Sequence, residues 1–309
     1  MKQHKTAGLI IASQQKAHGI QPLMKVGSLS VIRRMVLTYQ MAGIQMIVIV
    51  TGHEAKAVEK ELAGDGTILL TDPNYQEDEM LDAVKIGVDF LKDKCQSVLI
   101  SPSQMPSLMP ETIVNMLESE GQIIVPSYQQ RQGHPVLLSQ NYFGELLDYR
   151  GESGLKSFLT ERRHLTRWVN VSDTGILYAT EEMLLRKVNA GQVQSIHPAV
   201  KIALEHDKPF FDSRAKLLLM LIVETHSVKA ACSMIGMSYS KAWNILNALE
   251  RELGYTVVQR RHGGSGGGKT FFTQNGLDFL NRYDQFESNI REFVRQEFKK
   301  QFQSDRTGE

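Results

Sequence analysis

The feature that most limits how this chain can fold is an ordered run of helix signals, a turn and a glycine tract within residues 213–283. Over residues 236–254, apolar side chains recur every three or four positions, which predicts a helix with one buried face. Shorter helical patterns at 214–225 and 228–235 precede it, and Gly236 ends the second. This order is that of a helix-turn-helix, whose last helix enters the major groove of DNA N-terminus first.

A β-branched run and a glycine-rich tract follow that helix. Residues 255–261 favour a strand, 262–268 a flexible tip and 269–273 a second strand, so a hairpin wing is predicted. We expect the DNA contacts from the cations beside the tip and from the polar start of the helix: Arg260, Arg261, Lys269, Ser238, Tyr239, Ser240, Lys241 and Asn244. Three alternatives remain. The glycine tract could be a linker, and Tyr239 and Trp243 could be packing residues that do not contact DNA. The domain could also bind protein and not DNA.

The same stretch resembles the winged helix of the ModE family of molybdate-responsive regulators, and more distantly the LysR-type winged helices. The matching features are Ala230-Ala231, Gly236-Met-Ser-Tyr239, Lys241-Ala-Trp243, Leu249-x-x-Glu-Leu-Gly254, Val258-x-Arg-Arg261, the glycine run and Thr273-x-x-Gly276. The resemblance implies a homodimer that binds double-stranded DNA.

Length and charge fit a two-domain organisation. A chain of 309 residues is long for one core. Residues 1–212 carry 21 Lys and Arg against 24 Asp and Glu, whereas residues 213–309 carry 14 against 10, so positive charge gathers in the part expected to bind DNA. The sequence has no apolar run long enough to span a membrane, and Cys95 and Cys232 lack metal-binding spacing, so a cytoplasmic protein is expected.

Strand and helix patterns alternate along the first part of the chain. Strands are expected at 9–12, 45–51, 67–70, 97–100 and 122–126, and helices at 30–41, 54–62, 77–91, after Pro110 and at 181–187. This alternation predicts an α/β fold with a doubly wound, mostly parallel sheet. Such sheets bind ligands at the carboxyl ends of their strands, which here are the loops after Ala12, Thr51 and Ile100.

Loop sequences in this part resemble the MobA-like nucleotidyltransferases, which transfer nucleotides to the molybdenum cofactor and similar acceptors. The matching pieces include Leu9-Ile-Ile-Ala12, Pro22-Leu23, Val26-Gly27, Ala42-Gly43-Ile44, Ile47-Val-Ile-Val-Thr-Gly52, Met105-Pro106, Gly133-His-Pro135, Gly151-x-Ser-Gly154 and Asp173-Thr174. The resemblance implies a ligand or nucleotide pocket formed by Ser13, Lys16, Gly19, Met80, Gln104, His134 and Asp173.

The departures from this family fall on its chemistry. Only Gly19 and Lys16 remain of the loop that cradles phosphates. Gln104 stands where the family has a metal-binding Asp, so Asp173 lacks its acidic partner for Mg²⁺. We therefore expect a domain that binds a ligand and has lost catalysis. The alternative is an active Mg²⁺-dependent enzyme that uses a nucleotide and holds its metal with Asp78, Glu79 or Asp173.

Two further features leave alternatives open. His134 either contacts the ligand or only begins the strand at 136–138. An aromatic stripe from Tyr283 through Phe286, Ile290, Phe293, Val294 and Phe298 requires cover from its own domain or from a second subunit.

The expected organisation is therefore a nucleotidyltransferase-like domain over 1–195, a connection over 196–212, and a winged helix-turn-helix domain with a C-terminal dimerisation helix over 213–309. In this connection, the Phe210-Phe211 pair is expected to dock onto one of the domains. We expect a DNA-binding transcriptional regulator linked to molybdenum or its cofactor, which senses a nucleotide or a cofactor-related ligand. The alternative is a molybdenum cofactor cytidylyl- or guanylyltransferase with a fused DNA-binding domain.

Overall fold

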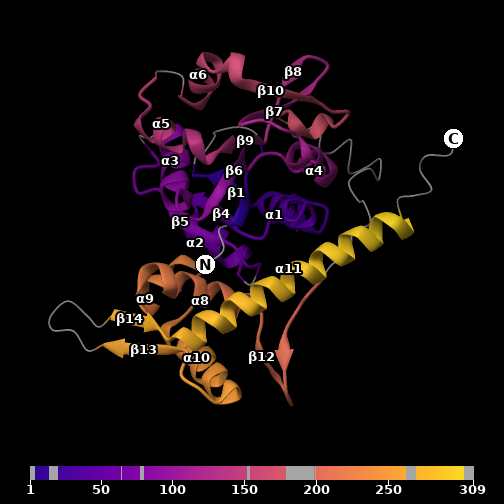
Figure 1. The fold of residues 1–309 in the computed structure, drawn as a ribbon. Coiled ribbons are helices and arrows are strands. Elements are labelled where there is room, and N and C mark those ends of the chain that lie inside the picture. Colours follow the sequence, from indigo (N-terminus) through magenta and orange to yellow (C-terminus); the bar gives the residue numbers. More distant parts are fainter. Residues whose placement is uncertain are drawn as a thin grey trace. The chain divides into compact units, whose positions relative to one another are not determined.

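A computed structural model shows two compact units, one within Gln3–Ser195 and one within Ile196–Glu309 (Figure 1). It describes residues 4–13, 20–63, 65–76, 80–151, 154–178, 198, 200–261 and 269–302. The helix expected at 181–187 lies outside these ranges. Within them, no helix combines the length and the hydropathy that a membrane crossing requires.

A mixed β-sheet forms the centre of the N-terminal unit. Its strands are β1 His4–Ala12, β4 Ile47–Thr51, β5 Ile68–Thr71, β6 Cys95–Pro102, β7 Ile123–Tyr128, β8 Arg131–Gln132, β9 Val136–Ser139 and β10 Thr166–Asn170. They lie in the order β10-β7-β9-β6-β1-β4-β5, and β8 pairs with β7. The strand β9 is antiparallel to β6 and β7, whereas β10, β7, β6, β1, β4 and β5 all run in one direction. The expectation of a mostly parallel sheet is confirmed.

Helices cover both faces of this sheet (Figure 1). They are α1 Val31–Met41, α2 Ala55–Glu61, α3 Met80–Leu91, α4 Pro110–Glu118, α5 Phe143–Asp148 and α6 Gly154–Glu161, with short 3-10 turns at Gln140–Tyr142, Arg163–Leu165 and Thr174–Ile176. Along β1, Ile10 packs in one core cluster with Met35 of α1 and Ile113 of α4. The neighbouring Leu9 instead faces α3, where a Cβ on Gly87 would lie 2.2 Å from its Cδ1 atom. Alternate side chains of this buried strand thus pack against helices on opposite faces of the sheet.

The C-terminal unit contains a small hairpin, three helices, a second hairpin and a long final helix. These elements are β11 Leu204–Glu205, β12 Pro209–Phe211, α8 Ser213–Thr225, α9 Val228–Met234, α10 Tyr239–Leu253, β13 Val258–Arg261, β14 Lys269–Phe272 and α11 Gln274–Phe302. The side chains of Asp212, Ser227 and Ser238 accept backbone N–H bonds and cap α8, α9 and α10. The second hairpin pairs Val258 with Phe272.

A buried ionic cluster joins α8 to α11. Lys216 Nζ lies 2.5 Å from an oxygen of Asp284 and 2.9 Å from one of Glu287, and Arg291 lies 2.6 Å from the other Glu287 oxygen. Burial alone would raise the pKa of Glu287, but the nearby Lys216 and Arg291 outweigh it and hold that pKa below its usual value. Glu287 is therefore a carboxylate that depends on its two cations.

We expect Lys216→Met to destabilise the C-terminal unit by about 3 kcal/mol, because it leaves Glu287 buried with only one cation. The measurement is urea-induced unfolding of the full chain, followed by hydrogen exchange at the amides of α8. Lys92→Met removes an exposed ion pair with Asp89 and serves as the matched control, for which no measurable change is expected. Equal stabilities for the two variants would contradict the structural role of the cluster.

Candidate functional site

The carboxyl ends of the parallel strands meet at one edge of the N-terminal sheet. There the backbone N–H of His53, after β4, donates to the Ser13 carbonyl at 3.2 Å, and that of Ser103, after β6, donates to the Ile11 carbonyl at 2.9 Å. Ser13 is 1% exposed, and within the described part of the chain its Oγ atom has no hydrogen-bond partner. The expected site residue Ser13 thus lies at this edge, whereas Lys16 and Gly19 fall outside the described residues.

Asp173 lies in the loop after β10, and its carboxylate is fully engaged by protein donors. One oxygen accepts the Gly175 N–H at 2.7 Å, and the other accepts the Met109 N–H at 2.9 Å and the Thr112 hydroxyl at 2.8 Å. The side chain is buried; it caps the 3-10 turn Thr174–Ile176 and contacts the start of α4. In this arrangement, Asp173 joins two loops, and each of its oxygens accepts at least one hydrogen bond from the protein.

The other expected pocket residues lie on neighbouring loops of the same edge. Gln104 is half-buried after β6, next to the fully buried Met105, and Met80 is half-buried at the start of α3. Asp78 and Glu79, the alternative metal ligands, lie outside the described residues. Among the residues that the structure does describe, no three His, Cys, Asp or Glu side chains are grouped to hold a metal ion. At the position of Gln104, the chain offers a neutral amide, which is a weaker ligand for Mg²⁺ than a carboxylate.

His134 lies two residues before β9 and is held against the loop after β10. Its backbone N–H donates to the Ile176 carbonyl at 2.8 Å, and its ring meets that of Tyr178 edge-on, with centroids 5.7 Å apart. The ring is half-buried, but its Nδ1 atom is shielded from solvent and has no partner among the described residues. Burial lowers the pKa of His134 to about 4. His134 is consequently a neutral group with an unsatisfied nitrogen, beside the loop that contains Asp173.

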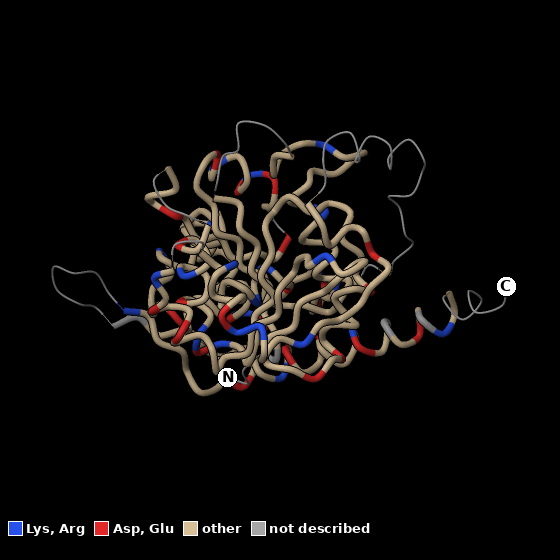
Figure 2. The backbone as a smooth tube through the Cα atoms, turned by 90° about the horizontal axis from the view of Figure 1, so that it is seen from above, with Lys and Arg blue, Asp and Glu red and all other residues tan. Residues whose placement is uncertain are grey.

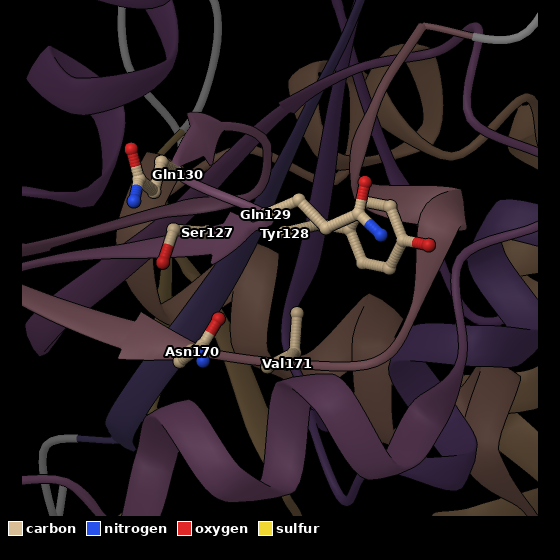
Figure 3. Close-up of a pocket in the computed structure, with 6 residues that line it drawn as sticks. All are labelled: Ser127, Tyr128, Gln129, Gln130, Asn170 and Val171. Carbon is tan, nitrogen blue, oxygen red and sulfur yellow. The ribbon is translucent and has the colours of Figure 1, made fainter.

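A pocket of about 450 Å³ opens at the carboxyl ends of β7 and β10 (Figure 3). Its lining consists of hydroxyls, amides and one valine and carries no charge: Ser127, Tyr128, Gln129, Gln130, Asn170 and Val171. Gln129 and Gln130 form the turn into β8 and have positive φ angles of 47° and 65°. Sequence reasoning missed these residues because it predicted no strand at 166–170, and Gln-Gln is not a typical sequence for a turn of this geometry.

In the C-terminal unit, the polar start of α10 is exposed. Ala242, Leu246 and Leu249 bury the opposite face of the helix, and Trp243 is half-buried with the Tyr239 ring edge-on at 6.1 Å. All five expected contact residues of this helix are exposed to solvent: Ser238, Tyr239, Ser240, Lys241 and Asn244.

The β13–β14 hairpin adds the remaining expected cations. Arg261 pairs in register with Lys269, and Arg260 pairs with Thr270, so these basic residues lie beside the tip at 262–268, which the structure does not describe. Lys269 is exposed, and the side chains of both arginines lie outside the description. Figure 2 shows a basic residue, in blue, where the hairpin meets its tip. The base of the hairpin is tied to α10, because a Glu250 oxygen accepts the N–H groups of residues 257 and 258 at 2.7 and 2.9 Å.

Comparisons with known proteins agree with this architecture. Residues 16–166 match the family described as the MobA-like NTP transferase domain. The structure of Rv0371c from Mycobacterium tuberculosis H37Rv superposes on 60% of this chain and 98% of its own, with 19% identity and a TM-score of 0.53. A nucleotidyl transferase from Methanothermobacter thermautotroptrophicus superposes on 60% of this chain and 97% of its own, with 16% identity and a TM-score of 0.52. The N-terminal unit therefore contains a MobA-like NTP transferase domain and has a nucleotidyltransferase-like fold.

A second similarity is to ModE regulators. The transcriptional regulator ModE of Yersinia pestis is 33% identical over 75 residues, which are 24% of this chain and 28% of that protein. The DNA-binding transcriptional dual regulator ModE of Escherichia coli (strain K12) is 32% identical over 77 residues, which are 25% of this chain and 29% of that protein. The chain thus matches less than a third of the length of these curated relatives.

The buried position of His134 gives a pH prediction. Between about pH 6.5 and about pH 4, the unfolded chain binds a proton at this histidine that the folded chain excludes, so the histidine lowers folding stability as the pH falls through that window. We expect an NMR titration to show a neutral His134 ring at about pH 5.5, where a free histidine is mostly protonated. His134→Gln should make stability less dependent on pH in this window. A ring that is protonated at that pH in the folded chain would contradict the burial of Nδ1.

Proposed function

We propose that this protein is a DNA-binding transcriptional regulator, in which the C-terminal unit is a winged helix-turn-helix and the N-terminal unit binds a regulatory ligand. The observation that carries the proposal is the exposed polar start of α10 beside a hairpin whose tip is flanked by Arg260, Arg261 and Lys269. Two surfaces that suit DNA thereby belong to one small unit, which also holds the positive part of the chain's charge.

The geometry of the C-terminal unit supports major-groove binding. In this proposal, α8 and α9 support α10, which enters the groove by its N-terminus. Lys241 and Asn244 lie one turn apart on the exposed face, so both reach base edges or phosphates. The hairpin then acts as the wing, and its cations contact phosphates or the minor groove.

The similarity to ModE supports a link to molybdenum and a dimer. Phe286, Phe293 and Phe302 of α11 are exposed by 46%, 65% and 64%. Large aromatic side chains repeated along one helix favour burial against another surface. A second copy of α11 supplies that cover and places two recognition helices on a palindromic site.

The N-terminal unit supports ligand binding without transfer. Gln104 replaces an acidic ligand, and the oxygens of Asp173 are occupied by backbone and hydroxyl donors. The uncharged pocket at Ser127 and Asn170 offers amides and hydroxyls, which suit a heterocycle with donor and acceptor edges. The ligand is a nucleotide or a molecule related to the molybdenum cofactor. Its binding changes DNA affinity by favouring one geometry of the dimer.

The DNA-binding proposal predicts a change in salt dependence. Lys241→Ala and Lys269→Ala should each weaken binding and lower the slope of log K against log salt by about 1, because each removes one phosphate contact. Fluorescence anisotropy of the full chain with promoter fragments at several salt concentrations measures this slope. Lys56→Ala, an exposed position on α2, removes the same charge and should leave the slope unchanged. Absence of salt-dependent binding by the unaltered protein would overturn the proposal.

A second candidate function is a Mg²⁺-dependent nucleotidyltransferase acting on the molybdenum cofactor. It is favoured by the match of residues 16–166 to the MobA-like NTP transferase domain. In this alternative, the DNA-binding unit makes the enzyme self-regulating.

Pyrophosphate release separates the two functions. With CTP or GTP, Mg²⁺ or Mn²⁺ and a pterin acceptor, we expect no release above background, because Gln104 supplies a neutral amide where the resemblance places a metal-binding Asp. The test uses the full chain, with an active nucleotidyltransferase of this fold as positive control. Metal-dependent release that is lost in Asp173→Asn would favour the enzyme.

A further inference from the structure

Residues 200–212, which the sequence assigns to a connection, are built into the C-terminal unit. We call this segment the strap. Its two short strands pair antiparallel, with Leu204 opposite Phe211 and Glu205 opposite Pro209. The strap contacts α11 and α10 and leads directly into α8.

The first half of the strap is attached to α11. The Tyr283 hydroxyl donates to the Ile202 carbonyl at 2.9 Å, and the Arg291 guanidinium donates to the Val200 carbonyl at 3.4 Å. Phe211, at the end of the strap, is 1% exposed and meets the rings of Phe279 and Tyr283 edge-on, with centroids 4.8 and 4.7 Å apart. Aromatic packing and hydrogen bonds therefore hold the strap along one side of α11.

The middle of the strap reaches the C-terminal end of α10. His206 Nδ1 lies 3.0 Å from a carboxylate oxygen of Glu252, one residue before the helix ends at Leu253. The His206 ring also lies beside Phe210 within the strap, with centroids 5.3 Å apart. The segment then ends at Asp212, whose side chain caps α8 by accepting the N–H groups of residues 214 and 215. One short segment thus joins the long helix to the end of α10 that lies opposite its exposed polar start.

We propose that the strap is a positioning element: it fixes the orientation of α10 relative to α11, and a displacement at its α11 end is transmitted to α10. The proposal rests on the proposed function only in calling α10 the recognition helix. Tyr283 and His206 are the positioning residues.

The test is hydrogen–deuterium exchange of the full chain, read at the last turn of α10, residues 249–253. Tyr283→Phe keeps the aromatic ring and removes only the hydroxyl that holds the Ile202 carbonyl. His206→Ala removes the contact with Glu252. We expect the exchange rate in the last turn of α10 to rise about threefold in each variant, because each variant loses about one hydrogen bond. Exchange in the strands of the N-terminal unit should not change.

Two variants separate positioning from general destabilisation. His206→Asn places an amide nitrogen near the position of Nδ1 and should restore the exchange of the unaltered protein. Asp207→Ala changes an exposed neighbour in the same turn and should have no effect. The proposal fails if Tyr283→Phe loosens only residues 200–205 and leaves α10 unchanged, or if His206→Asn does not restore protection.

DNA affinity of the same variants provides the second readout. We expect both Tyr283→Phe and His206→Ala to weaken binding to a promoter fragment by about threefold, although neither residue belongs to the proposed DNA-binding surface. Unchanged affinity in both variants would overturn the link to recognition. If the unaltered protein binds no DNA, the proposed function fails, whereas the exchange experiment still decides whether the strap positions α10.

Discussion

The carboxyl edge of the N-terminal sheet depends on one carboxylate, that of Asp173. Its three hydrogen bonds join the loop after β10 to the start of α4, which follows the loop after β6. The interlocking is close: a Cβ on Gly175 would lie 2.1 Å from the Ser107 carbonyl oxygen, so a side chain is excluded there. A buried carboxylate is stable only if donors compensate the loss of water, and here the protein supplies all of them. Asp173 thereby joins two segments that lie more than 60 residues apart in the sequence.

Backbone hydrogen bonds also hold the other loops at this edge. The parallel strands still deliver their loops to one edge, and the His134 loop is still held there through the Ile176 carbonyl. The groups beside Asp173 at this edge include neutral ones: Gln104, a His134 ring whose pKa is lowered by burial, and the amide-lined pocket. Neutral donors and acceptors recognise a ligand by shape and hydrogen bonding but do not stabilise the charge that develops during phosphoryl transfer.

The C-terminal unit separates its charges into buried and exposed groups. Lys216 is buried and forms ion pairs with Glu287 and Asp284 between α8 and α11. Lys241 and Lys269, in contrast, are exposed to solvent. The internal pairs hold the long helix against α8, and the strap holds the same helix near α10. The exposed cations are thus separate from the ion pairs that hold the helices together.

Local signals in the sequence determined most of the elements. Periodicity placed α8 and α9 within one residue of their observed bounds and α10 within three, because the side chains that bury one face of each helix recur at local spacing. The alternation of strands and helices likewise determined the parallel sheet. Only the tertiary structure decided that β9 runs antiparallel between β6 and β7. It also decided that Asp173 accepts hydrogen bonds from Met109 and Thr112, and that residues 200–212 pack on α10 and α11. Those contacts join residues that are distant in the sequence or that meet only because a loop reverses the chain direction. A periodic pattern carries no information about which distant group will be the partner.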